Sequence, residues 1–370
     1  MKVAIVHYWL VTWRGGEKVV EAFAEMFPEA DIYTHVLDPE VVKGTGLEHR
    51  RIFTTFINRL PFAKKRYQNY LPLMPMALER LDLRDYDLVI SSESGPAKGV
   101  IVRPDAYHVC YCHSPMRYLW DMRHDYEQGA SWIKRMAMLL LFPRLRDYDR
   151  LSSMGVDAFV ANSSWVGKRI EKYYRRESHV IAPPVDVDSF HISETIGDYY
   201  LMVGQLTRYK RVDLAVEAFN ELGLPLVVIG EGEETAALRK MARGNIHFMG
   251  RQPFSVIQKH YAECKALIFP GVEDFGMVPV EAMASGRPVI AFRKGGACES
   301  VVEDVTGIFF DQPTAESLMA AVKRFQAMEG SFVPATLRKH AQTFGKRNFL
   351  DRFRQFLAER CGHVESSPSA

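Results

Sequence analysis

Short apolar runs alternate with longer amphipathic stretches along almost the whole chain. The runs are too short for buried helices and are rich in Val, Ile and Leu, as buried strands are. They lie at Val3–Val6, Leu88–Ile90, His108–Cys112, Ala158–Ala161, Tyr200–Val203, Leu226–Ile229, Ala266–Phe269 and Val289–Ala291. Because helical stretches follow most of these runs, the sequence predicts an α/β protein whose parallel sheets carry helices on both faces.

The strand and helix pattern restarts once, near the middle of the chain. Pro183-Pro184 interrupts it, and a new apolar run begins at Tyr200. Two consecutive prolines break both helix and sheet, so we place an interdomain linker there. A chain of 370 residues also suits two domains better than one core. We expect domains at residues 1–184 and 185–345, and a disordered tail after Cys361.

The segment Gly271–Ile290 contains the most informative motif of the chain. Gly276 precedes a stretch of strong helix formers, and Pro279 fits a first helical turn, where a missing N–H costs little. A glycine loop at a helix N-terminus presents unpaired N–H groups, which suit an anion such as a pyrophosphate. Glu273 and Glu281 could accept hydrogen bonds from sugar and ribose hydroxyls. Two Glu residues at this spacing also occur by chance, so an ordinary strand-loop-helix is the alternative.

The whole string, with Phe275-Gly276, Pro279 and the Gly-Arg-Pro-Val exit at 286–289, resembles the donor-site motif of retaining glycosyltransferases of family 4. The resemblance implies the GT-B architecture, in which two facing Rossmann-like domains with parallel sheets enclose an interdomain cleft. It also implies that an amphipathic last helix, at about residues 346–362, crosses back onto the N-terminal domain. Within the motif it assigns donor contacts to Glu273, Phe275, Gly276, Met277, Val278 and Glu281.

The N-terminal domain contributes further residues by the same resemblance. Gly15 and Gly16, between the first strand and a helical pattern, match a Gly-Gly loop over the donor diphosphate, although a tight turn explains them equally well. His113 ends a strand and matches a histidine that faces the donor sugar, whereas a lone histidine is usually structural. Arg117 and Trp120 either shape an acceptor pocket or serve packing.

The C-terminal domain opens with a loop that resembles the family's Gly-Arg-Leu turn. Lys210 matches the lysine that holds the donor diphosphate, and Arg251 lies in a turn that borders the nucleobase in the family. Gln205 stands where Arg is usual, so one cation is missing, and Arg208 on the same loop could replace it. Gly230-Glu-Gly232 is only a fragment of a dinucleotide fingerprint, and we interpret it as a tight strand-to-helix turn.

Metal and disulfide chemistry are not predicted. Asp186-Val-Asp188 has the spelling of a metal-binding Asp-x-Asp, but it follows two prolines, where Asp commonly supports turns, and we assign no metal to it. No cysteine pair has zinc-type spacing, and the five cysteines suggest a reducing, cytoplasmic setting; they are Cys110, Cys112, Cys264, Cys298 and Cys361. A net charge of +2 gives no field that would attract nucleic acid. No cofactor is expected besides the nucleotide-sugar co-substrate.

A basic segment with interleaved aromatic residues contains Arg59, Lys64, Lys65 and Arg66. It is either a solvated helical face or a peripheral patch that meets anionic head groups at the inner face of a membrane. The N-terminal run reads as a buried strand, not as a signal peptide. The longest apolar run, Met136–Phe142, is too short to span a bilayer.

These residues and the resemblance together predict retaining transfer of a hexose from a nucleotide sugar to a saccharide or lipid-linked saccharide. Tyr209–Asp213 and the N-terminal half look most like mannosyltransferases of polysaccharide or O-antigen assembly, so GDP-mannose is the favoured donor. Lys210 would stabilise the leaving diphosphate, while Glu273 and His113 would orient the sugar. The alternatives are a nucleotide-sugar epimerase on the same fold and, because of Gln205, a non-catalytic nucleotide-sugar-binding protein.

Overall fold

A computed structural model describes residues 1–128 and 131–361 of the chain. The chain divides into two compact units. Unit 1 comprises Met1–Ala182 and the residues from Leu350 onward, and unit 2 comprises Pro183–Phe349. The boundaries expected from the sequence, after residues 184 and 345, differ from these by two and four residues. The tail after Cys361, which we expected to be disordered, lies outside the described residues.

In its described residues, unit 1 forms a parallel sheet with the strand order β3-β2-β1-β4-β5-β6-β7. Its strands are β1 (Val3–His7), β2 (Asp31–Thr34), β3 (Ile52–Thr54), β4 (Leu88–Glu93), β5 (Tyr107–Cys112), β6 (Ala158–Ala161) and β7 (Ser178–Val180). The register pairs His7 of β1 with Ser92 of β4, and Ser92 with Tyr111 of β5. The carboxyl ends of these three strands therefore meet at one edge of the sheet.

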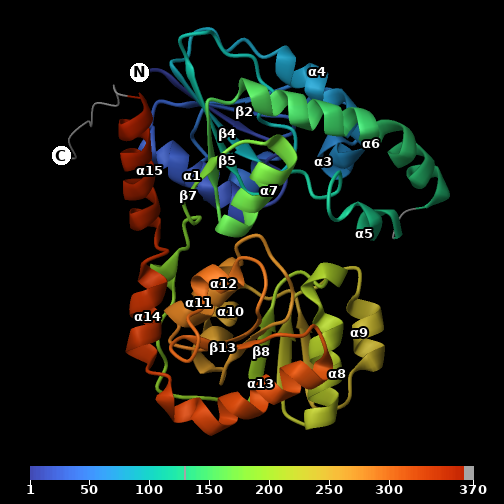
Figure 1. The fold of residues 1–370 in the computed structure, drawn as a ribbon, viewed down its shortest axis with the longest axis vertical. Coiled ribbons are helices and arrows are strands. Elements are labelled where there is room, and N and C mark those ends of the chain that lie inside the picture. The colour runs from blue at the N-terminus through green and yellow to red at the C-terminus, as the bar shows by residue number, and fades with distance from the viewer. Residues whose placement is uncertain (129–130, 362–370) are drawn as a thin grey trace. The chain divides into compact units, whose positions relative to one another are not determined.

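Helices surround the strands of unit 1 (Figure 1). They are α1 (Gly15–Met26), α2 (Pro39–Val42), α3 (Ala63–Arg66), α4 (Met74–Glu79), α5 (Arg123–Gln128), α6 (Trp132–Ser152), α7 (Ser164–Tyr174) and the C-terminal α15 (Lys346–Cys361), with 3-10 turns η1 (Phe56–Arg59), η2 (Tyr67–Leu73) and η3 (Ser153–Gly155). The Ser163 hydroxyl caps α7 by accepting the Val166 N–H. Phe353 of α15 contacts Phe23 of α1 with ring centroids 4.7 Å apart, which holds the end of the chain in unit 1.

In its described residues, unit 2 has a second parallel sheet with the order β10-β9-β8-β11-β12-β13. Its strands are β8 (Tyr200–Val203), β9 (Leu226–Ile229), β10 (Ile246–Gly250), β11 (Leu267–Phe269), β12 (Val289–Phe292) and β13 (Gly307–Phe310). Its helices are α8 (Val212–Leu222), α9 (Thr235–Met241), α10 (Phe254–Glu263), α11 (Met277–Ala284), α12 (Ala297–Ser300), α13 (Ala315–Met328) and α14 (Pro334–Gln342), with 3-10 turns η4 (Val187–Ser189), η5 (Arg208–Lys210) and η6 (Glu329–Ser331).

The strand order of each sheet reverses direction once. The reversal lies between β1 and β4 in unit 1, and between β8 and β11 in unit 2. Open α/β sheets bind ligands beyond the carboxyl ends of their strands at such a switch point, because the connections leave in opposite directions and open a crevice there. Each unit therefore has one edge where a site is expected.

Two smaller features bear on the sequence predictions. Cys110 and Cys112 of β5 pack in one cluster with Phe159 and Ile170, so they face the same side of the sheet as expected.

Across residues 1–128 and 131–361, no helix is both long enough and apolar enough to cross a bilayer.

Candidate functional site

The switch point of unit 2 brings together two predicted donor residues that are 63 positions apart in the sequence. The Lys210 ammonium, in η5 after β8, forms an ion pair with the Glu273 carboxylate in the loop after β11. Both side chains are more than four-fifths buried. Gly271 makes this approach possible, because a Cβ there would lie 2.7 Å from the Lys210 Cα. The pair joins the ends of β8 and β11, which are neighbours in the sheet.

Helix α11 begins where the motif predicted. Gly276 precedes it with a φ of 82°, a left-handed conformation that favours glycine, and Met277 and Val278 start the first turn. Pro279 is the third helical residue and leaves no N–H unpaired there. The first N–H groups of α11 therefore have no partner within the helix, and its positive dipole end follows the Glu273 loop directly. This arrangement can bind a phosphate group.

A second loop packs tightly on the Glu273 loop. A Cβ at Gly296 would lie 2.3 Å from the Phe275 Cα, and one at Gly295 would lie 2.5 Å from the Glu273 carbonyl oxygen. The Gly296 N–H donates to that same carbonyl at 2.9 Å. The Phe275 side chain is buried, with its ring 5.7 Å from that of Phe344. Phe275 therefore fixes the loop by packing. The sequence analysis did not predict the role of the second loop.

Glu281 has a partner that the sequence analysis missed. The hydroxyl of Tyr261, a fully buried residue of α10, donates a hydrogen bond of 2.8 Å to the Glu281 carboxylate. Burial, and then the neighbouring carboxylate, raise the pKa of Tyr261 well above its usual value, so the phenol keeps its proton and remains a donor. Tyr261 thus fixes the orientation of Glu281.

The remaining predicted residues of unit 2 border the same edge. Gln205 and Arg208 lie on the loop between β8 and α8, and Arg251 directly follows β10 and is exposed. Gly230 and Gly232 serve backbone packing, since a Cβ at Gly230 would lie 1.9 Å from the Gly204 carbonyl oxygen and one at Gly232 would lie 2.2 Å from that of Leu206. The interpretation of Gly230-Glu-Gly232 as a tight turn therefore agrees with the structure.

In unit 1, a hydrogen-bonded row crosses the carboxyl ends of β1, β4 and β5. The Ser92 hydroxyl lies 3.0 Å from Nδ1 of His7 and 2.8 Å from Nε2 of His113. Burial lowers the pKa of His113 to about 4, and burial together with the neighbouring His113 lowers that of His7 well below its usual value. Both imidazoles are therefore neutral near pH 7. The sequence predicted His113 but not its connection to His7.

Gly16 lies beside this row. A Cβ on Gly16 would lie 3.7 Å from Nε2 of His113 and 2.6 Å from the Tyr8 hydroxyl oxygen, so a larger residue would push these groups apart. Gly15 and Gly16 are the first two residues of α1, so their N–H groups belong to its unpaired N-terminal turn. The Glu17 carboxylate accepts the Arg14 N–H at 2.9 Å. Burial raises the pKa of Glu17.

A buried charge network lies beneath the same edge of unit 1. Lys98 pairs with Glu93 at 3.1 Å and also with Asp149, and all three side chains are at most 1% exposed. Burial alone would lower the pKa of Lys98, but the two carboxylates raise it. Trp120 donates to Asp149 at 2.7 Å and stacks on Tyr173. These contacts hold Trp120 in place by packing, and its role in shaping an acceptor pocket stays a prediction.

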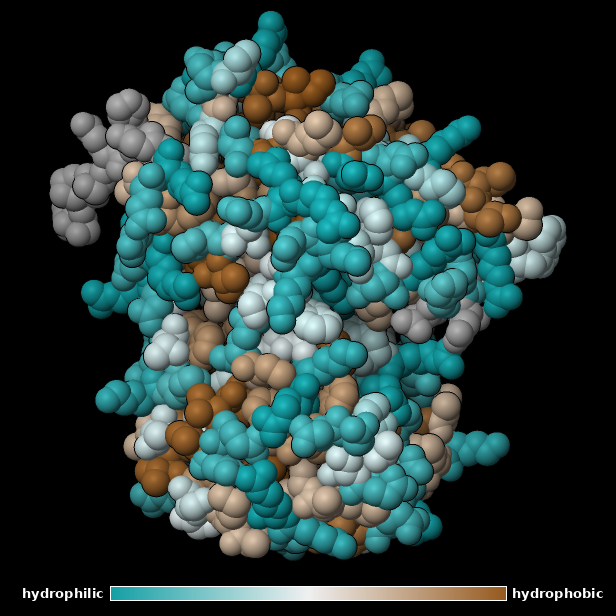
Figure 2. Space-filling view, in the orientation of Figure 1, coloured by the Kyte–Doolittle hydropathy of each residue, from teal (hydrophilic) through white to brown (hydrophobic). Residues whose placement is uncertain are grey.

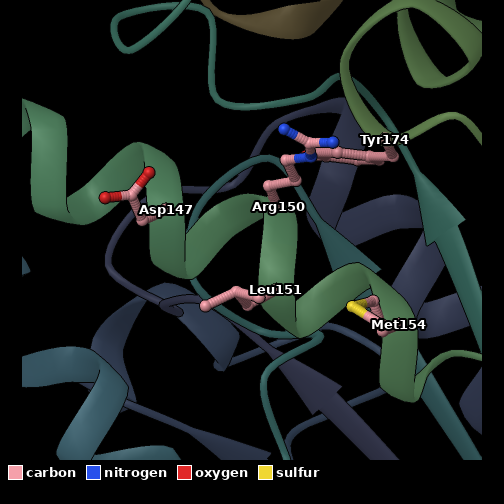
Figure 3. A pocket seen from close by; sticks show the side chains of 5 residues that line it. All are labelled: Asp147, Arg150, Leu151, Met154 and Tyr174. Carbon is pink, nitrogen blue, oxygen red and sulfur yellow. The ribbon is translucent and has the colours of Figure 1, made fainter.

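A hollow of about 540 Å³ opens elsewhere on unit 1 (Figure 3). Its lining residues come from α6, η3 and α7 and are Asp147, Arg150, Leu151, Met154 and Tyr174. The chain runs from η3 directly into the start of β6, so this hollow lies at the amino edge of the sheet, opposite His113. It holds none of the predicted site residues.

The Asp186-x-Asp188 sequence forms a turn, as we interpreted it, and the Ser189 hydroxyl donates to the Asp186 carboxylate. Within residues 1–128 and 131–361, no three His, Cys, Asp or Glu side chains gather closely enough to hold a metal ion.

Two family models match the chain, one on each side of the proline linker. "Glycosyltransferase Family 4" matches residues 13–189, and "Glycosyl transferases group 1" matches residues 191–347. The uncharacterized glycosyltransferase MJ1178 of Methanocaldococcus jannaschii is 24% identical over 209 residues, 55% of this chain and 58% of that protein. The chain thus spans little more than half the length of that relative. The O-antigen chain mannosyltransferase C of Escherichia coli is 24% identical over 346 residues, 85% of each chain.

Among solved structures, the chain is similar to Anabaena Alr3699/HepE in complex with UDP and glucose. The TM-score is 0.71 at 14% identity, over 97% of this chain and 99% of that one. At this identity the likeness bears on the fold, and the two parallel sheets follow the GT-B pattern. The chain therefore belongs to the family 4-like glycosyltransferases with the GT-B fold.

Proposed function

We propose that this protein transfers mannose from GDP-mannose to a saccharide or lipid-linked saccharide during the synthesis of a cell-surface polysaccharide, with retention of the anomeric configuration and without a metal ion. The observation that carries the proposal is the Lys210–Glu273 pair beside the N-terminus of α11, at the switch point of unit 2. A cation, a carboxylate and unpaired N–H groups are what a sugar diphosphate needs. Support for mannose comes from the name of the E. coli relative.

We assign each donor residue a role according to the charge or hydrogen-bonding capacity of its side chain. The Lys210 ammonium and the N–H groups near Gly276 and Met277 stabilise the negative charge that grows on the leaving diphosphate. Glu273 exchanges its contact with Lys210 for hydroxyls of the sugar. Glu281, oriented by Tyr261, accepts hydrogen bonds from the ribose. In this proposal the diphosphate is bound by Lys210 and the N–H groups of α11, while the hydroxyls of the sugar and the ribose are bound by Glu273 and Glu281.

Same-face attack accounts for retention. The bond between the anomeric carbon and the diphosphate oxygen breaks, and the acceptor oxygen bonds to the same face of the sugar. The acceptor proton passes to the leaving phosphate oxygen, so no separate base is required. Such a route needs no carboxylate nucleophile, unlike retaining glycosidases with their closely spaced carboxyl pair. His113 orients the sugar through a hydroxyl.

The basic segment of unit 1 is our candidate contact for a lipid-linked acceptor. Lys65 and Arg66 are exposed, and so is Arg59. The side chain of Lys64 is 52% exposed although its ammonium lies 3.1 Å from Asp38. Each such cation contributes on the order of 1 kcal/mol near an anionic surface. We therefore propose a cytoplasmic protein that works at the inner face of the membrane.

The test begins with donor binding. Thermal unfolding is measured with GDP-mannose, UDP-glucose and an ADP-sugar, because a ligand that binds the native state raises the melting temperature by mass action. UDP-glucose belongs in the panel because UDP and glucose are bound in HepE. GDP-mannose should give the largest increase. An increase in melting temperature with UDP-glucose alone would reject GDP-mannose as the donor, but it would remain consistent with sugar transfer.

Product analysis then tests the chemistry. With an acceptor present, proton NMR of the new linkage should show the anomeric configuration of the donor, and a chelator should leave the rate unchanged. Incubation of the donor alone should return the same sugar, since an epimerised sugar would identify the rival epimerase. Donor binding without transfer or hydrolysis of any donor would identify a non-catalytic binding protein, the alternative that Gln205 suggests.

A further inference from the structure

The first half of α6 exposes an unusual number of large apolar side chains. Five of them are at least half exposed: Trp132 (75%), Ile133 (63%), Met136 (50%), Leu139 (55%) and Leu140 (69%). At about 100° per helical residue, these five fall within an arc of roughly 120°. In Figure 2, apolar side chains gather on the part of unit 1 that Figure 1 draws as α6. Single exposed apolar residues are normal, whereas a contiguous patch marks an interaction surface.

This patch does not belong to the core of unit 1. The same helix has a separate buried side, where Phe142 and Leu145 form a cluster with Met116 and Leu119. Met138 and Leu141 pack partly against that cluster. The helix is therefore already attached to unit 1 through one face, and its second apolar face points away from this attachment.

Helix α6 also carries exposed cationic side chains. Lys134, Arg135 and Arg144 are exposed on α6, and no Asp or Glu occurs between residues 131 and 146. Arg135 keeps its place through a hydrogen bond of 2.9 Å to the Glu127 carbonyl oxygen. At about 100° per residue, Arg135 and Arg144 fall beside the apolar arc, whereas Lys134 falls on the opposite side of the helix. An apolar face with arginine at its margins suits the boundary between head groups and acyl chains of an anionic bilayer.

The basic segment of unit 1 is connected through Leu71 to the buried side of α6. Leu71 of η2 packs both on the α6 cluster and on the cluster around Ile57 and Met74. Phe62, in the turn before α3, is 69% exposed, and the guanidinium of Arg66 lies 5.3 Å from its ring centroid. The segment from Arg59 to Arg66 and the first half of α6 therefore expose the same mixture of apolar and cationic groups on one unit.

We propose that the first half of α6 is a membrane-docking surface, which inserts its exposed apolar face into the head-group layer of an anionic bilayer while its cations contact lipid phosphates. The inference specifies the membrane contact suggested under the proposed function, but it does not depend on sugar transfer. Charge complementarity selects the occupant, because a zwitterionic bilayer or an apolar protein surface would not use the cations around the patch.

The test measures vesicle binding by the full chain. The protein is sedimented with vesicles of phosphatidylcholine alone and with vesicles that also contain phosphatidylglycerol. We expect binding to the anionic vesicles only, weakened by salt. The double substitution Ile133→Ser/Leu140→Ser should weaken this binding at least tenfold, since each loses apolar burial in the bilayer. The matched control is Ile101→Ser/Leu151→Ser, which changes two side chains that are each 63% exposed and should leave binding unchanged.

Fluorescence gives a second, local readout. Trp132 emission should shift to shorter wavelength with anionic vesicles, and Trp132→Phe should abolish the shift. The proposal is rejected if anionic vesicles do not bind, or if both double variants lose binding equally. It is also rejected if ultracentrifugation without lipid shows a dimer that Ile133→Ser/Leu140→Ser dissociates, because the patch would then be a contact between two copies. Donor-induced thermal shifts, measured on the same variants, report separately on the proposed function.

Discussion

The Ser92 hydroxyl oxygen lies 2.8 Å from Nε2 of His113. The same hydroxyl lies 3.0 Å from Nδ1 of His7, whose own Nε2 is buried without a hydrogen-bond partner among the described residues. A buried N–H without an acceptor is costly, so His7 should carry its proton on Nδ1 and donate it to Ser92. Ser92 then donates its proton to Nε2 of His113, and His113 becomes an N–H donor at Nδ1.

This row predicts the tautomer of His113. Nitrogen NMR of the labelled protein should show His113 protonated at Nδ1, and Ser92→Ala should shift it toward the Nε2-protonated form. If His113 orients the sugar, Ser92→Ala should lower kcat about tenfold, typical of lost positioning around a catalytic group. A structural role alone would shift the tautomer but leave kcat unchanged. An Nε2-protonated His113 in the wild type would contradict the assigned direction of the row.

The Lys210–Glu273 pair predicts a loss of activity with little loss of fold. Lys210→Met removes the cation that we propose faces the donor diphosphate and should lower kcat/KM about a hundredfold or more, as for other transition-state charge contacts. Glu273→Gln should act in the same direction. The control is Lys265→Met, which breaks the 2.5 Å pair with Asp198 in the same unit. An unchanged rate in Lys210→Met would remove this residue from the mechanism.

The close packing at Gly296 predicts a steric effect on the donor loop. Gly296→Ala should displace Phe275 and destabilise unit 2 by about 1–3 kcal/mol, as overpacking commonly does. Urea unfolding followed by circular dichroism measures the stability, and the thermal shift with donor should shrink as well. Gly244→Ala is the control, because no heavy atom lies within 4 Å of its Cβ position. Equal stability of the two variants would show that the loop yields without cost.

Buried histidines predict that unit 1 loses stability in acid. Burial lowers the pKa values of His35 and His108 to about 4, against about 6.5 in the unfolded chain. Between these values the unfolded chain binds more protons, so stability falls as the pH decreases from about 6.5 to 4. Each histidine contributes a slope of up to about 1.4 kcal/mol per pH unit.

Tryptophan fluorescence can isolate this effect. All five tryptophans lie in unit 1; they are Trp9, Trp13, Trp120, Trp132 and Trp165. Urea unfolding followed by their emission should show that the free energy of unfolding of unit 1 falls as the pH decreases from about 6.5 to 4. His35→Gln should reduce the slope of this free energy against pH by the contribution of one histidine. His124→Gln, at a side chain that is 85% exposed, should leave the slope unchanged.

Eight of the thirteen strands in the described residues were predicted from apolar runs, and β2, β3, β7, β10 and β13 were missed, although β13 is itself apolar and buried. Every strand expected from such a run is present in the structure. The missed strands include β3 and β7, each three residues long at an edge of the unit 1 sheet, and β2, which begins with Asp31. Edge strands bury one side only, so their apolar signal is weak. Hydrogen bonding to neighbouring strands stabilises these strands, although their own residues show little strand preference.

The candidate site was predictable where its residues form a contiguous motif. Gly276, Pro279 and Glu281 occupy the helical positions expected of them. The Tyr261–Glu281 bond and the His7–Ser92–His113 row connect segments far apart in the sequence, and no local pattern indicates which residues will meet. Whether the predicted residues contact a nucleotide sugar, and whether a cleft forms between the domains, remain predictions.

If unit 2 binds the proposed donor, the glycine contacts limit how its donor preference could be altered in the laboratory. Gly271 and Gly296 touch the backbones of Lys210 and Phe275, so the inner surfaces of these loops admit no added atoms. A change of the preferred sugar or base would therefore require substitutions at exposed side chains. Arg251, which is exposed, is the first choice. Mutant libraries that randomise the glycines would consist mostly of destabilised chains, whereas libraries that spare them would vary the chemistry on an undisturbed backbone.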